Sequence, residues 1–268
     1  MSGDVVLTGS AFLVSPETAP PDGAVGWFDP AEHLGARGWK YLTPATRFLL
    51  ATAQLALVDA KLDPATMAPE SMGVAVGTNF AADPVVGRLD HTVRTEGAHW
   101  LSPAEAPNFS VNMAASHLSM KWAMRAFNLT LTNPMVAGID AVLTMAGAIR
   151  RGRARLGLAG ATEERPTAYR PAGGTAGEGA CCLVLESRET AIERGATPLA
   201  TVAGGFSRFR GQPPEEDGTP RVTVSADAPY LTLAPLLAAL DLLAVHGRAT
   251  VVASSPHGNL ATLTLSDR

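Results

Sequence analysis

The stretch TNPMVAGIDAVLTMAGAIRRGRARLGLAGATEE, residues 132–164, has the layout of an enzyme's active-site turn. A turn of small residues opens a helix, the helix ends in basic residues, and a buried apolar strand closes on Gly-Ala-Thr-Glu. Met135 stands where such a turn would carry its nucleophile. A thioether has no proton to lose and forms no stable acyl-enzyme, so covalent acyl transfer is excluded at this position.

Other side chains that could do chemistry are few. Cys181 and Cys182 are neighbours in the strand GACCLVLE, so they point to opposite faces and are expected to be buried, inert thiols. His257, in the turn SSPHGNL, is interpreted as a structural turn residue, with a relic or a functional base as the alternatives. Glu163 and Glu164 are adjacent and do not face each other, which argues against paired general acid–base work.

The remaining histidines have no metal-ligand spacing between them. They are His33, His91, His99, His117 and His246. The Gly-rich stretches fit neither a phosphate loop nor a dinucleotide motif. The sequence therefore predicts no metal and no cofactor.

Composition excludes several classes of function. The chain has 268 residues, of which 46% are hydrophobic and 17% charged, so it can bury a sizeable core. Its net charge is -4 and its only basic run is the short RRGRAR at 150–155, which argues against nucleic-acid binding. No leader and no membrane span are recognised, and the two cysteines indicate a reducing compartment. We expect a cytoplasmic protein with no membrane contact.

Hydrophobic periodicity and turn residues predict the elements that position these residues. Strands are predicted at 4–13, 72–79, 128–133, 155–162, 177–187 and 198–209. Helices are predicted at 42–62, 110–127, 139–152 and 187–196, the first capped by Thr43 with Pro44 in its first turn. Residues 80–108 and 206–222 are expected to be irregular, residues 223–268 to form one apolar helix and two strands, and no short internal repeat is visible. The alternation predicts an α/β protein, a layered sheet covered by helices.

The order strand, turn, small-residue helix, IRRGRA, strand, GATEE, GEGA-x-x-LVLE and ERGATPLATVAG resembles the β-ketoacyl synthases, condensing enzymes of the thiolase fold. The earlier pieces LTPATRFLLATAQLALVDA, GVAVGT and NFSVNMAASHLSMKWAM extend the resemblance over residues 1–205. The resemblance implies a thiolase-like layered α-β-α-β-α fold with an abbreviated C-terminal half. Residues 1–205 would be the N-terminal half, 206–222 a polar loop and 223–268 the shortened C-terminal half, packed as one domain.

The resemblance also shows which reactive positions have changed. Alignment on Gly138-Ile139-Asp140-Ala141 places Met135 at the family's nucleophilic cysteine. Of the family's two C-terminal histidines, one lies in an HGTGT-like stretch that this chain lacks, and the other is matched by Leu231. With three reactive positions replaced or missing, the resemblance implies that catalysis is not this chain's task.

One branch of the family fits that pattern: the chain-length factor, or ketosynthase β subunit, of type II polyketide synthases. It lacks the cysteine and forms a heterodimer with a catalytic ketosynthase. Its elbow commonly carries glutamine, and Met135 in that place implies loss of decarboxylation as well. Compact members occur with polyene-making systems. The implied partners are therefore a catalytic ketosynthase and, through it, an acyl carrier protein.

In this fold the strand before the elbow, 128–132 here, pairs across the dimer two-fold, and a growing acyl chain enters a tunnel between the subunits. The resemblance implies a set of tunnel or interface side chains: Phe109, Asn112, Met113, His117, Thr130, Thr132, Pro134 and Met135. Met135 either lines that tunnel or fills the lost active site. Two alternatives remain: a stand-alone acyltransferase or hydrolase using Cys181, Cys182 or His257, and a homodimeric scaffold without a ligand.

Overall fold

One mixed sheet runs through the whole chain in the computed structural model, which describes residues 3–16, 26–167, 176–215, 217–225 and 228–267. The strand order is β3-β2-β4-β5-β1-β6-β9-β8-β7. The strands are β1 Val5–Val14, β2 Met72–Gly77, β3 Phe127–Leu131, β4 Leu156–Glu163, β5 Gly179–Ser187, β6 Ala200–Phe209, β7 Arg221–Val224, β8 Ala249–Ser254 and β9 Asn259–Ser266.

The sheet has two halves that meet at β1 and β6. These strands pair at only two positions, Val6 with Thr201 and Leu7 with Ala200. In the first half, β2 runs parallel to β3 and β4, and β5 is antiparallel to β4 and β1. In the second half, β9 is antiparallel to β6 and β8, and β7 is parallel to β8.

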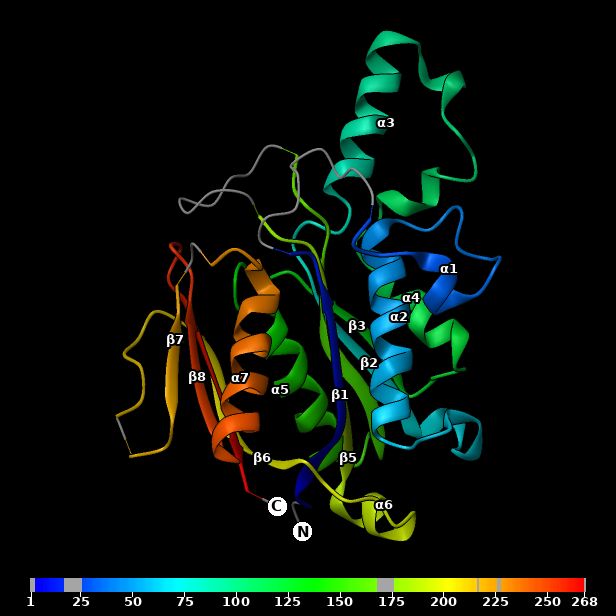
Figure 1. Ribbon diagram of the computed structural model, residues 1–268. Coiled ribbons are helices and arrows are strands. Elements are labelled where there is room, and N and C mark those ends of the chain that lie inside the picture. The colour runs from blue at the N-terminus through cyan, green and yellow to red at the C-terminus, as the bar shows by residue number, and fades with distance from the viewer. Residues whose placement is uncertain (1–2, 17–25, 168–175, 216, 226–227, 268) are drawn as a thin grey trace.

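The helices form layers around these halves (Figure 1). They are α1 Pro30–Leu34, α2 Pro44–Asp59, α3 Asp83–Thr95, α4 Met113–Lys121, α5 Ala137–Arg150, α6 Arg188–Glu193 and α7 Ala234–His246, with short 3₁₀ turns η1 Pro64–Thr66, η2 Pro69–Ser71, η3 Ala98–Trp100, η4 Ala106–Phe109 and η5 Leu231–Leu233. α5 and α7 pack in one core cluster with both halves, whereas α2 and α4 cover the other face of the first half. None of the helices in the described ranges is long and apolar enough to cross a membrane.

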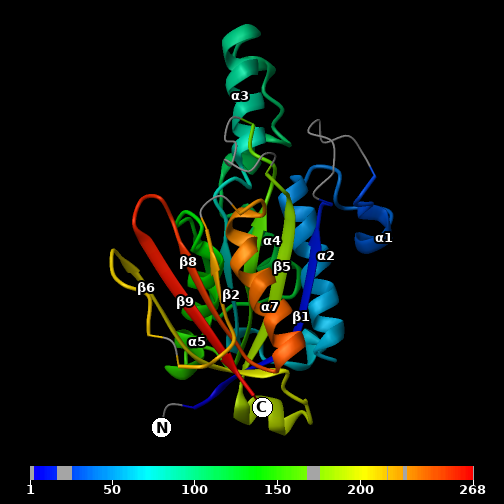
Figure 2. The ribbon, with the colours of Figure 1, turned by 60° about the vertical axis from the view of Figure 1, so that its left-hand side comes forward.

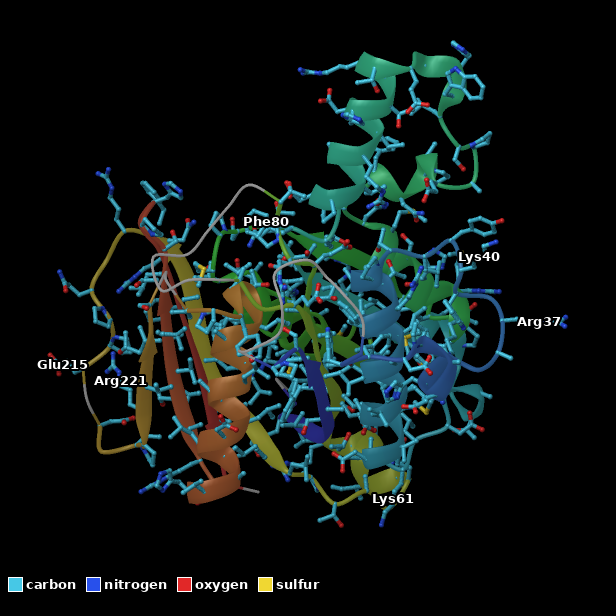
Figure 3. All side chains as sticks on the ribbon, turned by 45° about the horizontal axis from the view of Figure 1, so that its top comes forward. Arg37, Lys40, Lys61, Phe80, Glu215 and Arg221 are labelled. Atoms are coloured by element: carbon cyan, nitrogen blue, oxygen red, sulfur yellow. The ribbon has the colours of Figure 1, made fainter. Side chains whose placement is uncertain are left out.

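The outer face of the second half carries coil instead of a helix. The described residues between β6 and β7, 210–215 and 217–220, lie outside the sheet, where Figure 3 labels Glu215 and Arg221. Arg208 on β6 and Arg221 on β7 both donate side-chain hydrogen bonds to carbonyls of this coil, from Gln212 and Pro214. In Figure 2, β6, β8 and β9 come forward with no helix over them. Of the five expected layers, the described residues form four: α2 with α4, the first half of the sheet, α5 with α7, and the second half of the sheet. The outermost described segment is coil.

Several predicted boundaries were wrong. Residues 80–108, expected to be irregular, contain α3, which begins with Pro84 in its first turn and buries only Val85, so it shows little apolar periodicity. The helix expected over 110–127 is α4 alone, because Ala123 adopts a left-handed φ of 51° and β3 begins at Phe127. The loop expected over 206–222 is narrower, since β6 runs to Phe209 and β7 starts at Arg221.

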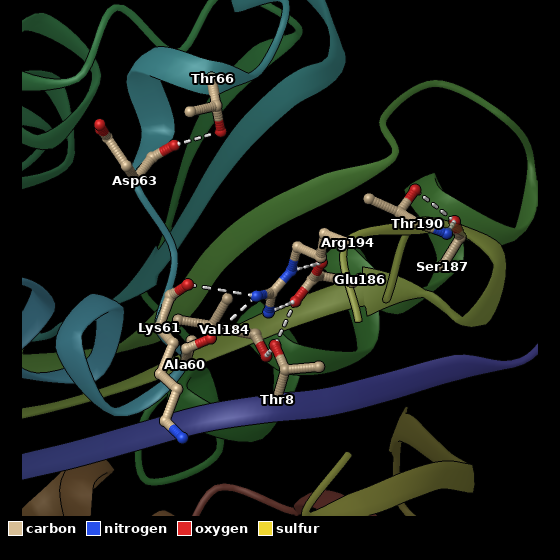
Figure 4. Close-up of polar contacts among 10 residues, drawn as sticks. All are labelled: Thr8, Ala60, Lys61, Asp63, Thr66, Val184, Glu186, Ser187, Thr190 and Arg194. Atoms are coloured by element: carbon tan, nitrogen blue, oxygen red, sulfur yellow. Dashed lines mark hydrogen bonds and ion pairs between the residues drawn. The ribbon is translucent and has the colours of Figure 1, made fainter. Parts of the chain in front are cut away.

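A buried ion pair ties β5 to the end of α2 (Figure 4). The carboxylate of Glu186, which is fully buried, accepts from Nε and Nη2 of Arg194 at 2.8 and 2.5 Å. The hydroxyl of Thr8 donates to the same carboxylate. Nη1 of Arg194 donates to the carbonyls of Ala60 and Lys61 at 2.9 and 3.4 Å, directly after the last residue of α2. One guanidinium therefore neutralises a buried charge and caps a helix.

Candidate functional site

The turn between β3 and α5 keeps the backbone of a catalytic elbow. Met135 has a φ of 64°, in the left-handed region that non-glycine residues rarely adopt, and its side chain is 5% exposed. The amide of Ala137 donates to the carbonyl of Asn133 at 3.0 Å, and the Asn133 amide donates to Asp140 at 2.6 Å. These bonds close the turn. The strained conformation persists although the residue that holds it has no reactive atom.

Leu231 sits in the same kind of turn at the start of the other central helix. It has a φ of 50°, is 1% exposed and precedes α7 through η5. The two turns lie close together, because a Cβ on Gly138 in α5 would collide with the carbonyl oxygen of Thr232. Met135 and Leu231 pack in one small apolar cluster with Phe80 at its edge. The side chains of Met135 and Leu231, the two positions that the resemblance assigns to reactive residues, are therefore in one apolar cluster.

A cavity of about 340 Å³ opens between these turns. It is lined by Asn79, Phe80, Pro134, Met135, Leu231, Pro256 and His257. The structure thus brings four residues singled out from the sequence, Pro134, Met135, Leu231 and His257, to one place. Asn79 and Phe80 were missed, although their position directly after the buried strand β2 was the available signal. Among the described residues that line the cavity, none carries a thiol, hydroxyl, amine or carboxylate, and the polar side chains are the amide of Asn79 and the imidazole of His257.

The carboxylate of Glu163 holds the backbone of two residues that line this cavity. Its carboxylate accepts from the amides of Asn79 and Phe80 at 3.0 and 2.8 Å and from the hydroxyl of Thr232 at 2.6 Å. It also accepts from Thr78 at 3.3 Å. Burial raises the pKa of Glu163 to about 7, against the lowering effect of these hydrogen bonds. The side chain therefore joins β2, β4 and η5, which belong to different halves of the chain.

Glu164 turns away from this network. It lines a separate cavity of about 390 Å³ with Arg47, Trp27 and Glu178, and its Oε2 has no hydrogen-bond partner among the described residues. Burial, with a smaller contribution from the nearby Glu178 carboxylate, raises the pKa of Glu164 to about 8. Glu163 and Glu164 do not act as a pair, as the sequence indicated.

We expect Glu164→Gln to stabilise the protein at pH 8 by about 1–3 kcal/mol. The folded-state pKa of about 8 lies above the ordinary value of 4.5, so the folded state holds the proton more tightly. The stability contributed by this proton is therefore complete below pH 4.5 and is lost as the pH rises towards 8. Urea unfolding at a series of pH values measures the slope. Glu163→Gln is the contrast: its oxygens accept from several donors, so an amide there should destabilise by about 1–3 kcal/mol.

The two cysteine side chains are buried in the core of the protein. Cys181 faces the central core cluster and Cys182 faces the cluster with α2 and α4, on opposite faces of β5. Both are at most 1% exposed. Burial raises the pKa of Cys182 to about 12 and that of Cys181 beyond the ordinary range. The expectation that both thiols are buried is confirmed, and neither thiol is among the residues that line the elbow cavity. That they are inert stays a prediction.

A thiol reagent such as a dithiobis-nitrobenzoate should therefore not react with the native chain. At a pKa of about 12, on the order of one thiol in ten thousand is ionised at pH 8. Both thiols should react within minutes once guanidinium unfolds the protein. Reaction of even one equivalent in the native state would contradict the burial seen here.

The other predicted site residues lie outside the elbow cavity, on η4, α4 and β3. Phe109 is 60% exposed, Asn112 and Thr132 are exposed, and Met113 and Thr130 are half-buried. His117 is half-buried too, and burial lowers the pKa of its imidazole. α4 packs beside β3, where Asn128 donates to Ser119 at 2.7 Å. The predicted set therefore divides into an enclosed group at the elbow and an open group along the first strand of the sheet.

That first strand is an edge. β3 pairs only with β2 among the described strands, and Leu129 in its centre is 44% exposed. Of the neighbouring helix α4, Met120 is a large apolar side chain that is exposed, at 63%. Further exposed apolar side chains are on α3, on the 3₁₀ turns after it and in the segment before α4: Val86, Val93, Trp100, Phe109 and Val111. α3, which carries the first two, projects beyond the rest of the fold (Figures 1 and 2). An unpaired strand with exposed apolar neighbours is typical of a protein interface.

Within the described residues, no group of three or more His, Cys, Asp or Glu side chains is placed to hold a metal ion. The polar groups of the elbow cavity, Asn79 and His257, come from two different loops.

Comparisons with known proteins agree with the sequence resemblance. A profile of the family "Beta-ketoacyl synthase, N-terminal domain" matches residues 28–170, more than half of the chain. The chain is 26% identical over 204 residues to the 3-oxoacyl-[acyl-carrier-protein] synthase 2 of Coxiella burnetii, covering 66% of this chain and 49% of that protein. It is 26% identical over 238 residues to the tetracenomycin polyketide synthase ketoacyl synthase beta subunit of Streptomyces glaucescens, covering 79% and 57%. The chain spans about half the length of the curated relatives it matches.

Solved structures match along the whole chain. One is a type II polyketide synthase complex, "AntDE:AntF", of an acyl-carrier protein with its ketosynthase, with a TM-score of 0.80, 18% identity and full coverage of both chains. Another is "the ishigamide ketosynthase/chain length factor", with a TM-score of 0.78, 19% identity and coverage of 98% and 99%. The compact fold with four layers is therefore that of known ketosynthase-like chains. By its family profile and its layered fold, this chain belongs to the β-ketoacyl synthase family and has the thiolase-like fold.

Proposed function

We propose that this chain is a non-catalytic, chain-length-factor-like subunit that pairs with a catalytic ketosynthase in type II polyketide biosynthesis. The observation that carries the proposal is the elbow. Met135 and Leu231 both have a left-handed backbone conformation, and the described residues that line the cavity between them carry no thiol, hydroxyl, amine or carboxylate. A backbone strain of about 1–3 kcal/mol persists only where the surrounding structure fixes it. A protein with the backbone geometry of an active-site turn but without its reactive side chain is suited to shaping the surface that a partner binds.

The edge strand β3 supports the pairing. Strand addition at an open edge satisfies backbone groups and covers the exposed apolar side chains around it. The printed names of a relative and a solved structure, a ketoacyl synthase beta subunit and a ketosynthase/chain length factor, support the same role. In this proposal the partner supplies the nucleophile and receives the acyl carrier protein. The complex works in the cytoplasm, and its product belongs to the polyene class.

A stand-alone acyltransferase or hydrolase is the weaker reading. It needs a reactive side chain, and the two thiols are buried in the core clusters on either face of β5. His257 lines the elbow cavity without a thiol or hydroxyl beside it. An imidazole alone can accept a proton, but it has no nucleophile here to activate.

Co-expression with a type II catalytic ketosynthase tests the proposal. We expect a one-to-one complex by native mass spectrometry, with chain elongation from the pair and none from this chain alone. An obligate interface of this kind buries on the order of 2,000 Å² or more, so the isolated chain should be poorly soluble. A soluble monomer, or a homodimer that does not bind the ketosynthase, would contradict the proposal.

Phe109 should help to set product length. Its side chain is 60% exposed at the end of η4, four residues before the first residue of α4. We expect Phe109→Ala to shift the product distribution of the complex towards longer chains, because removing the ring deepens the tunnel. The stability of the chain should change by about 0.5 kcal/mol or less, since the side chain is largely outside the core. Mass spectrometry of the products measures the effect, with Phe12→Ala on β1, also exposed, as the control.

A further inference from the structure

The basic run RRGRAR, residues 150–155, is divided by the fold into side chains with internal partners and side chains without them. Arg150 donates from Nη2 to the carbonyl of Val202 at 2.6 Å and so joins α5 to β6. Arg155 pairs with Glu193 on α6. Arg151 and Arg153 are exposed, and neither forms an ion pair within the described part of the chain. The four arginines of the run therefore have two kinds of surroundings: Arg150 and Arg155 are bonded to other elements, and Arg151 and Arg153 face solvent.

Arg153 lies at the start of the edge strand. Its guanidinium is 5.9 Å from the ring centre of Phe127, the first residue of β3. Arg151 folds back along α5, so that a Cβ on Gly147 would lie 3.1 Å from its Nη1. Arg125, two residues before β3, is also exposed, and its nearest carboxylate is Glu70 at 3.8 Å. Arg125 and Arg153 thus lie at the start of the strand to which a partner would add, and Arg151 lies two residues from Arg153 at the end of α5. We call Arg125, Arg151 and Arg153 the arginine rim.

We propose that the arginine rim receives carboxylates of the partner ketosynthase. The inference rests on the proposed pairing through β3, because a strand added at that edge brings the partner's backbone along Phe127. Guanidinium groups bind carboxylates through two parallel N–H···O bonds, and Arg153, stacked on an aromatic ring, keeps its planar fork free for such a bond. The chain as a whole has a net charge of -4, whereas Arg151 and Arg153 have no ion pair within the described residues, and Arg125 has only the exposed pair with Glu70 at 3.8 Å.

Charge reversal tests the rim on the purified complex. The double variant Arg151→Glu/Arg153→Glu should raise the dissociation constant about tenfold or more at ~20 mM NaCl. At ~500 mM NaCl, where exposed charges are screened, the dissociation constants of the variant and the unaltered complex should differ by only about twofold. Arg210→Glu is the matched control, since Arg210 also stacks on a ring, that of Phe209 at 5.1 Å, but lies at the far end of β6.

A zero-length crosslink identifies the occupant. Arg153→Lys places an amine at the rim, and a carbodiimide should join it to an aspartate or glutamate of the ketosynthase, whereas Arg210→Lys should give no such product. Exclusive crosslinking to an acyl carrier protein would overturn the inference, as would an unchanged dissociation constant at low salt. Either result leaves the proposed function standing if the unaltered complex forms. Absence of any complex with the unaltered chain would overturn both.

Discussion

Replacing Arg194 by alanine should lower the free energy of unfolding by about 3–5 kcal/mol, the largest loss expected from any single charged side chain here. The substitution leaves the fully buried carboxylate of Glu186 with the Thr8 hydroxyl alone, and an unpaired buried charge is costly. It also removes the donor that caps the carbonyls of Ala60 and Lys61 at the end of α2. Urea unfolding followed by circular dichroism measures the loss.

Two comparisons isolate the cause of that loss. Arg155→Ala breaks the neighbouring pair with Glu193, whose side chains are 47% and 55% exposed, and should cost about 1 kcal/mol or less. A double variant, Glu186→Met with Arg194→Met, removes both charges and should regain most of the stability. A loss below about 1 kcal/mol for Arg194→Ala would show that water, rather than the guanidinium, satisfies Glu186.

Leu129→Asp should abolish the complex with the ketosynthase, raising its dissociation constant by about 100-fold or more, equivalent to about 3 kcal/mol. Leu129 is in the middle of the edge strand and 44% exposed, so in the proposed heterodimer a carboxylate there would be buried without a partner. The isolated chain should lose about 1 kcal/mol or less, because half of the side chain already faces solvent.

The matched control is Leu55→Asp. Leu55 is 39% exposed on the outer helix α2, away from β3, and its replacement should leave the complex intact. Native mass spectrometry of the co-expressed pairs distinguishes the two variants. Equal complex formation by both would place the partner on a surface other than β3.

The elbow and most of its supporting elements could be predicted because their signals are local. Thr43 caps α2 with Pro44 after it, as the sequence indicated. The strands β2, β4 and β5 are buried along nearly every residue and read as continuous apolar runs. α3 gave no such signal, because a helix that buries one residue shows little apolar periodicity. The projecting helix α3 was therefore not predicted from the sequence.

The composition of the cavity could not be predicted, since its walls come from turns that are far apart in the chain. Asn79 and Phe80 follow β2, whereas Pro256 and His257 lie between β8 and β9. The structure places Leu231 in one cluster with Met135. That Leu231 is the counterpart of a reactive histidine stays a prediction. The tunnel role of Phe109, Asn112, Met113, His117, Thr130 and Thr132 stays a prediction.

A repeat too distant for the sequence to show is present in the structure. Each central helix starts after a left-handed residue, Met135 or Leu231, and is followed by a left-handed glycine, Gly152 or Gly247, with φ of 70° and 72°. Each then leads into a buried strand, β4 or β8. The side chains differ almost throughout, so the two units share backbone geometry rather than residue identity.

The position of β1 inside the sheet has a consequence for how the chain is made. β1 emerges from the ribosome before its hydrogen-bonding neighbours β5 and β6, and its pairing with β5 begins with Gly179 opposite Val14. At a synthesis rate of roughly 5–20 residues per second, β1 waits on the order of 10–30 s for a strand to bind. Contacts of such long sequence separation fold slowly, and the waiting apolar strand is open to aggregation. Yield in a heterologous host should therefore depend on translation speed and on chaperones before any partner is met.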